Sequence, residues 1–176
     1  MTDAPPAPPE FSRVIDVRQT DRRDAVLEAN EAERAALARR FGIVRIERLS
    51  ATLELDREGS TVAITGTLAA DIVQSCAVSA EDLAVAVREP IAVRFVPRIH
   101  GHAPDEVIEI DADACDEIEY AGSEIDLGEA VAQSLALAID PFATGPQADE
   151  ARRKAGLFDA AASGPFAALA ALRKKD

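Results

Sequence analysis

Few side chains in this sequence have the type and spacing that a metal site requires. His100 and His102 lie two residues apart. With Cys76 or Cys115 they could form a zinc site. Neither cysteine belongs to a Cys-x-x-Cys pair, because Ser79 stands where a second thiolate would follow Cys76. We therefore interpret the histidine pair as part of a glycine-containing turn, and we expect no bound metal.

The cysteines also lack the surroundings of catalytic nucleophiles. Cys115 lies within DADACDEIE, where neighbouring carboxylates disfavour a thiolate. Cys76 follows a predicted strand, a position typical of a small buried residue. The sequence contains no Gly-rich phosphate loop, no Gly-x-Ser-x-Gly turn and no His-Glu-x-x-His helix. These observations predict a protein that is not an enzyme and that carries no cofactor.

The acidic residues have the most unusual distribution. The chain has a net charge of −13, from 19 basic and 32 acidic residues. Fourteen of the acidic residues lie between residues 99 and 151, which contain no lysine or arginine; the other 18 nearly balance all the basic ones. A protein of this charge repels nucleic-acid phosphate and anionic lipid, so we expect neither DNA nor a membrane as a partner.

Within this acidic third, Asp111, Asp113 and Asp116 are candidate partner-binding residues. The stretch lacks the central glycine and twelfth-position glutamate of a calcium loop. We therefore prefer two other interpretations of this stretch to a metal site: a solvated acidic face, or a docking surface for a basic partner.

Helices and strands that position these residues follow from periodicity. A helix is predicted over 21–40, capped by Asp21 and ended by Gly42. Period-2 alternation over 49–56 and 62–71 predicts a hairpin. A further alternation over 83–95 contains Pro90, which predicts a bulge or a sheet edge. Shorter strands are expected over 11–18, 107–110 and 117–120.

A second helix is predicted over 127–139. Asp126 would cap it, with Glu129 three residues on, and Pro141 would end it. The predicted fold class is α+β: an antiparallel sheet of about four to six strands, with barrel-like closure as an option, and two main helices packed on it. Residues 1–10, which contain four prolines, should be disordered. Residues 11–142 should form one domain, and residues 143–176 a loosely attached tail with a short amphipathic segment.

The order of these segments resembles the YceD family, the bacterial and plastid proteins named for large ribosomal RNA subunit accumulation. The resemblance rests on EFSRVIDV, QSCAVSAEDL around Cys76, EIDLGEAVAQSLALAIDPF and GPFAALAAL, together with the EAERAALARRFG helix. Many family members have a Cys-x-x-Cys pair where this chain has Cys76 and Ser79. The residues that match the family motifs, besides Cys76, are Asp126, Leu127, Glu129, Asp140, Pro141, Phe142, Pro165 and Phe166.

The resemblance implies a non-enzymatic cytoplasmic factor needed for accumulation of large-subunit ribosomal RNA. Its expected partner is a basic ribosomal protein or a pre-ribosomal large-subunit particle. Direct RNA contact through arginine and lysine patches is an alternative, and an acidic interaction domain unrelated to ribosomes is another. The start of the chain lacks the basic and apolar run of a signal peptide, and no apolar window reaches about 18 residues, which agrees with a cytoplasmic location.

Overall fold

The computed structural model describes residues 10–98 and 116–156. These residues form a five-stranded sheet, a two-stranded sheet and three α-helices, so the fold class is α+β as predicted. In chain order the elements are β1 (Val14–Asp16), a 3-10 turn (Val17–Gln19), β2 (Arg23–Glu28), α1 (Glu31–Phe41), β3 (Arg45–Glu58), β4 (Thr61–Ser75), β5 (Asp82–Pro97), β6 (Asp116–Tyr120), β7 (Glu124–Asp126), α2 (Leu127–Ala138) and α3 (Ala148–Lys154).

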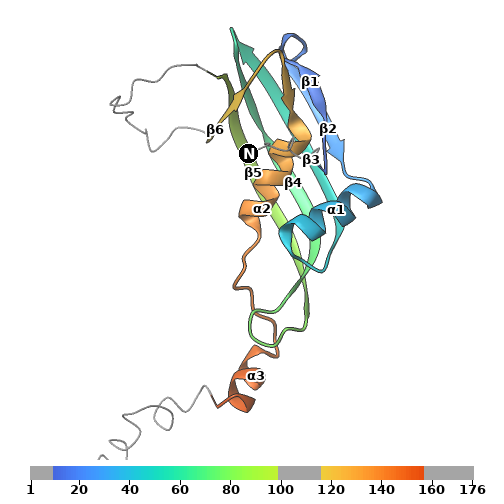
Figure 1. Cartoon of the computed structure of the whole chain (residues 1–176). Coiled ribbons are helices and arrows are strands. Elements are labelled where there is room, and N and C mark those ends of the chain that lie inside the picture. The colour runs from blue at the N-terminus through green and yellow to red at the C-terminus, as the bar shows by residue number, and fades with distance from the viewer. Residues whose placement is uncertain (1–9, 99–115, 157–176) are drawn as a thin grey trace, which may run out of the picture.

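The larger sheet has the strand order β2-β3-β4-β5-β6. Neighbouring strands are antiparallel except β5 and β6, which are parallel. The sheet is open, with β2 and β6 at its edges, so the barrel-like option is not realised. Figure 1 shows α1, α2 and the small β1–β7 sheet on one face of this long twisted sheet, and the opposite face carries no helix among the described residues.

The predicted hairpin is confirmed as β3 and β4, whose register runs from Arg45↔Val73 to Glu58↔Thr61. Alternate residues of both strands are buried beneath the helices, as the period-2 pattern requires. At Gly66 the β3 backbone lies so near that an added Cβ would be 2.1 Å from the Thr52 carbonyl oxygen. Only glycine fits this approach.

The predicted helix over 21–40 is wrong in its first half. Residues Arg23–Glu28 form the edge strand β2, which pairs along its whole length with β3. The helix begins after Asn30, not after Asp21: the Asn30 side chain accepts from the Glu33 N–H, and the Glu33 carboxylate accepts from the Asn30 N–H. The end of the helix at Gly42, in the left-handed conformation with φ of 67°, is as predicted.

The alternation over 83–95 forms one continuous strand that passes through Pro90 without a register shift. Because β6 pairs only with Val93–Pro97, Pro90 lies where β5 has a neighbouring strand on one side only within the described residues. The edge interpretation of Pro90 is therefore the correct one, and the bulge lies instead in β3, between Ile46 and Arg48. The strand expected over 117–120 is β6, and the one expected over 107–110 lies outside the described residues.

Helix α2 packs on the sheet as predicted. Val131 and Leu135 are fully buried and Leu127 is nearly so, within the same cluster as Phe11, Leu53 and the other inward residues of the sheet. The helix ends at Ala138, just before Pro141. In the part of the chain that the structure describes, no helix has the length and apolar character needed to cross a bilayer.

Candidate functional site

The longest family-like motif, residues 124–142, forms β7, α2 and the turn after it. At its centre Asp126 caps α2: one carboxylate oxygen accepts from the N–H groups of Gly128 (2.9 Å) and Glu129 (3.2 Å). The same carboxylate accepts from the Arg13 N–H at 2.7 Å and from the Ser12 hydroxyl at 2.5 Å. Asp126 therefore starts the helix and also holds the N-terminal segment of the domain against it.

The two residues after Asp126 have architectural roles as well. Leu127 is 3% exposed, and its N–H donates to the Arg13 carbonyl at 3.1 Å. A Cβ at Gly128 would lie 2.6 Å from the Phe11 carbonyl oxygen, so the approach of the N-terminal segment requires glycine there. The Asp-Leu-Gly start of α2 is thus explained by packing against residues 11–13.

Glu129 joins α2 to α1. Its carboxylate accepts two hydrogen bonds from Arg40, at 2.7 and 2.9 Å, and Arg40 also pairs with Glu10 at 3.1 Å. The hydrogen bond from Arg40 is the main reason that the pKa of Glu129 is lowered, and it raises the pKa of Arg40 in turn. A second ion pair, Arg13–Glu33 at 2.7 Å, ties the N-terminal segment to the start of α1.

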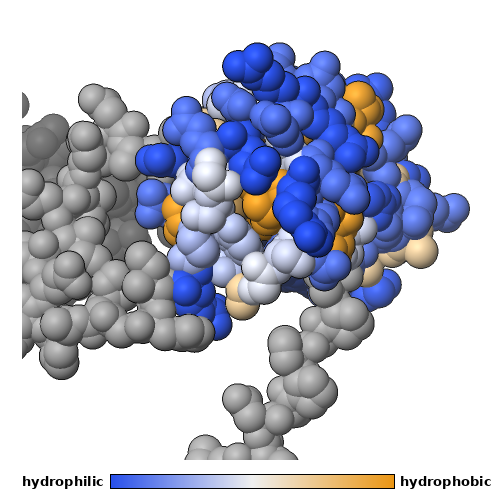
Figure 2. Space-filling view, turned by 90° about the horizontal axis from the view of Figure 1, so that it is seen from above, coloured by the Kyte–Doolittle hydropathy of each residue, from blue (hydrophilic) through white to orange (hydrophobic). Residues whose placement is uncertain are grey.

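A cavity of about 230 Å³ lies between β6, β7 and α2, next to this motif. Phe95, Ile118 and Tyr120 give it apolar walls, and the Tyr120 hydroxyl donates to the Ser60 carbonyl at 2.5 Å. The acidic residues that line it are Glu119, Glu124, Asp126 and Glu129. Figure 2 views the molecule from the end that carries the β3–β4 turn, and shows a mainly hydrophilic surface there with only small apolar areas.

The edge strand β6 belongs to the acidic third of the chain. Asp116, at its start, is exposed, whereas Asp111 and Asp113 lie outside the described residues. Two other carboxylates of β6 pair with arginines of β5: Glu117 with Arg94 at 3.7 Å, and Glu119 with Arg98 at 3.2 Å. All four of these side chains are about half exposed, so the pairs leave the edge accessible to a partner.

The second half of the motif lies at the other end of α2. The Asp140 carboxylate accepts from the Phe142 N–H at 2.8 Å, and the Asp140 carbonyl accepts from the Gln74 side chain at 2.8 Å. Pro141 stands between them, and the Phe142 side chain is 80% exposed. Because α2 has 12 residues and so measures about 18 Å, Asp140–Phe142 and Asp126–Glu129 are not parts of one site.

Cys76 lies in the turn between β4 and β5 and is 4% exposed. Its sulfur accepts from the N–H groups of Gly145 (3.3 Å) and Ser79 (3.4 Å). These hydrogen bonds, that from Gly145 foremost, lower the pKa of the thiol to about 6. Together with the bond from the Ala77 N–H to the Ala143 carbonyl, they attach the segment after α2 to this turn.

Within residues 10–98 and 116–156, no three or more His, Cys, Asp and Glu side chains are grouped so as to hold a metal ion. His100, His102 and Cys115 lie outside these ranges, as do Pro165 and Phe166. The structure thus brings Asp126 and Glu129 to the acidic cavity, buries Leu127 in the core, and places Cys76 and Asp140–Phe142 at the opposite end of the domain.

Three residues that sequence reasoning missed hold the motif in place: Arg13, Arg40 and Gln74. A basic residue such as Arg40 is favourable in the last turn of a helix, but nothing near it in the sequence indicates its partner on α2. Comparison of this chain with protein-family models, with curated proteins and with solved structures found no match.

Proposed function

We propose that this protein is a non-enzymatic factor of the YceD type that supports accumulation of large-subunit ribosomal RNA in the cytoplasm. It would act by binding a basic segment of a ribosomal protein or of a pre-ribosomal large-subunit particle. The observation that carries the proposal is the acidic edge at β6, with the cavity beside it lined by four carboxylate residues. Residues 99–115, which lead into β6, add five acidic residues and no lysine or arginine.

The cavity suits a lysine or arginine side chain of such a partner. The methylene groups of these side chains pack on apolar surface while the charged end stays near water and carboxylates. Phe95 and Ile118 offer that surface, and Glu124 is one of the carboxylate residues that line the cavity. The charge of the whole acidic third would steer a basic protein toward this edge and would set specificity more than affinity.

Direct RNA binding is the second candidate, and one observation favours it. Arg34, Arg39 and Arg45 line a hollow of about 470 Å³ between α1 and the start of β3, although Glu31 and Glu47 also line it and Arg45 pairs with Glu47 at 3.1 Å. The other basic residues are scattered or already paired: Arg40 with Glu129, Arg152 with Asp149, Lys154 with Glu150. The β6 carboxylates Glu117 and Glu119 are paired as well, so the preference for a cationic partner rests on the excess acidic charge of residues 99–151, which contain no lysine or arginine.

The decisive experiment is a pull-down of large-subunit ribosomal proteins with the full chain, before and after nuclease treatment. Retention of ribosomal proteins after RNA digestion supports the proposal, and loss of every partner on digestion contradicts it. The triple variant Asp111→Lys, Asp113→Lys, Asp116→Lys should lose binding, and raised salt should weaken binding by the parent. Stronger binding of the variant to bare RNA would instead favour direct RNA contact.

The chain offers a matched control for this variant. Asp24, Glu54 and Asp56 form an acidic group on the outer face of β2 and β3, where Asp24 lies directly opposite Glu54. Reversal of these three charges changes the net charge by the same amount on β2 and β3, which β4 and β5 separate from β6 in the sheet. If the control variant loses the partner as fully as the triple variant does, net charge alone explains the interaction and the β6 edge is not the site.

A further inference from the structure

A hollow of about 490 Å³ lies between β5 and the C-terminal half of α2. On the β5 side it is lined by residues 89–93, most of which pair with β4 but not with β6. Its apolar lining includes Pro90, Ile91, Leu137 and Ala138. Two acidic residues, Glu89 and Asp116, also line it, and no lysine or arginine does so among the described residues. It is therefore an open, shallow groove of mixed lining, in which apolar side chains lie beside two carboxylates, and it is separate from the cavity at β7.

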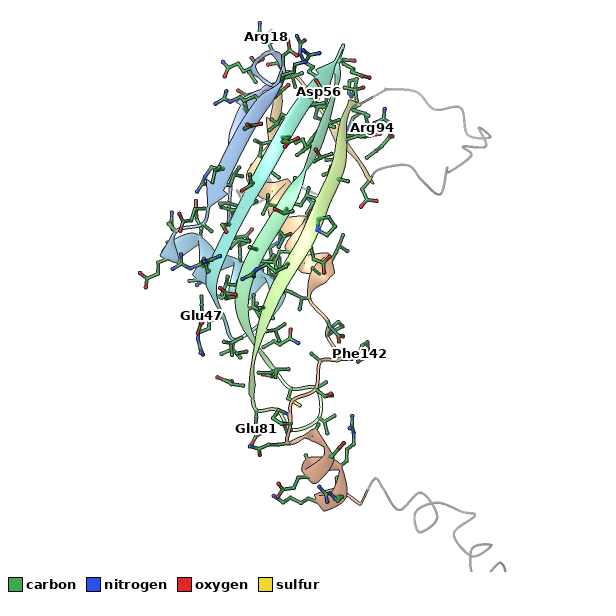
Figure 3. All side chains as sticks on the ribbon, turned by 180° about the vertical axis from the view of Figure 1, so that it is seen from behind. Arg18, Glu47, Asp56, Glu81, Arg94 and Phe142 are labelled. Atoms are coloured by element: carbon green, nitrogen blue, oxygen red, sulfur yellow. The ribbon has the colours of Figure 1, made fainter. Side chains whose placement is uncertain are left out.

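Of the two most exposed large apolar side chains of the described residues, Leu137 lines this groove and Phe142 follows four residues after the last groove residue of α2, Ala138. Leu137 is 83% exposed, although Leu135 on the same helix is fully buried, and Phe142 is 80% exposed. Figure 3 shows Phe142 on the chain that leaves α2, directed away from the sheet. Exposed apolar side chains grouped beside a groove are a feature of interaction surfaces.

We propose that the groove and these two side chains bind the C-terminal segment of the same chain, residues 164–172. This segment reads GPFAALAAL and places Phe166, Leu169 and Leu172 three residues apart, on one side of a helix. Arg173, Lys174 and Lys175 follow directly. The apolar side of the segment would cover Leu137 and Phe142, and the cations would lie near Glu89 and Asp116.

The length of the chain permits this arrangement. The hydrogen bonds of Ala143 and Gly145 hold the chain at the Cys76 turn, and α3, with seven residues, is about 10 Å long. Residues 157–163 can span up to about 25 Å when extended. A helix over 164–172 would add about 14 Å. These lengths together let the segment return past α3 as far as Phe142, which precedes α3 by only six residues in the chain.

Charge complementarity favours this occupant as well. The chain carries a net charge of −13, and the run Arg173–Lys175 is the only place where three basic residues end an apolar segment. An isolated helix this short is unstable in water, so the segment would be helical only when it is docked. The inference does not depend on the proposed ribosomal function.

The test is amide hydrogen exchange on the full chain. In the parent, the amides of 164–172 should exchange at least tenfold more slowly than in the double variant Leu137→Asp, Phe142→Asp. The matched control is Val26→Asp, a change at a 78% exposed apolar residue on the edge strand β2, which should leave that exchange unchanged. Equal exchange in the parent and the double variant would overturn the proposal.

A reciprocal variant keeps the test valid if the double variant Leu137→Asp, Phe142→Asp misfolds. Phe166→Asp with Leu169→Asp leaves the described domain untouched and should speed exchange of the amides near Leu137 and Phe142. Slow exchange that appears only at high protein concentration would show that a second copy occupies the groove, and it would overturn docking within one chain. Concentration-independent protection that both double variants abolish is the expected result.

Discussion

Arg40 and Glu129 lie 89 residues apart in the sequence, yet their side chains share two hydrogen bonds, of 2.7 and 2.9 Å. Arg40 is in the last turn of α1 and Glu129 in the first turn of α2. Each charge thus sits at the helix end that favours its sign. The pair joins the two helices at positions where each residue is also favourable by itself.

A double-mutant cycle with Arg40→Ala and Glu129→Ala should give a coupling free energy of about 1 kcal/mol at neutral pH. The Arg40 hydrogen bond lowers the pKa of Glu129 in the folded protein. The contribution of the Arg40–Glu129 pair to the free energy of unfolding is therefore complete above the carboxyl pKa of the unfolded chain, about 4.3. It is lost as the pH falls through the lower pKa of Glu129 in the folded protein. Urea unfolding at several pH values measures it.

The control for this cycle is the pair Arg45–Glu47, which lies within β3 and whose side chains are 53% and 55% exposed. Because water screens such a pair, its coupling at neutral pH should be about 0.2 kcal/mol. Equal coupling in the two cycles would show that the α1–α2 contact is no more than a surface ion pair.

Asp126→Ala should lower the free energy of unfolding by about 2–4 kcal/mol. The loss of the helix cap accounts for about 1 kcal/mol, and the loss of the hydrogen bonds to Ser12 and Arg13 for the rest. Asp126→Asn keeps a good cap and should cost less. Asp140→Ala is the comparison, because that carboxylate accepts only from Phe142 among the described residues, and it should cost about 1 kcal/mol or less.

Gly128→Ala should destabilise the protein by about 1–3 kcal/mol, because the new Cβ would lie 2.6 Å from the Phe11 carbonyl oxygen. In most helices the same change is stabilising by up to about 1 kcal/mol, so the sign of the effect is diagnostic. At Gly145 the nearest atom to an added Cβ is a Leu83 methyl carbon at 3.6 Å, and Gly145→Ala should stay within about 0.5 kcal/mol. Thermal and urea unfolding of the two variants and the parent measure these changes in the free energy of unfolding.

Sequence reasoning succeeded where the signal is local. The β3–β4 hairpin alternates over many residues with a turn between the strands, and α2 has its cap, its apolar stripe and its stop within 16 residues of sequence, 126–141. It failed for β2, whose residues RDAVLE are acceptable in a helix. They form a strand because pairing with β3 buries Leu27, and that pairing joins segments about 25 residues apart in the chain.

In the candidate site, too, the local features could be predicted from the sequence and the long-range contacts could not. Asp126 could be predicted as a cap, because capping depends on residue type and on the next three residues. Its bonds to Ser12 and Arg13 span more than 110 residues and could not be predicted. The glycine at 128 had no apparent reason in the sequence, since only the folded chain brings the Phe11 carbonyl beside it.

The thiol of Cys76 should titrate with a pKa of about 6 in the folded protein, because the N–H groups of Gly145 and Ser79 stabilise its thiolate. Ultraviolet absorbance of the thiolate, followed against pH in a Cys115→Ser background, measures this value directly. The unfolded value is about 8.5. Since the folded pKa is the lower one, the stabilisation is complete above about pH 8.5 and is lost as the pH falls toward 6.

Cys76→Ser should therefore destabilise the protein more at pH 8.5 than at pH 6, which separates this effect from a simple loss of packing. Denaturant unfolding of the parent and the variant at both pH values is the measurement. Gly145→Pro removes the N–H that contributes most to the shift and should raise the pKa of Cys76, whereas Gly145→Ala, which keeps that N–H, should not. A Cys76 thiol that titrates near 8.5 in the parent would show that the segment after α2 does not hold the turn as the structure indicates.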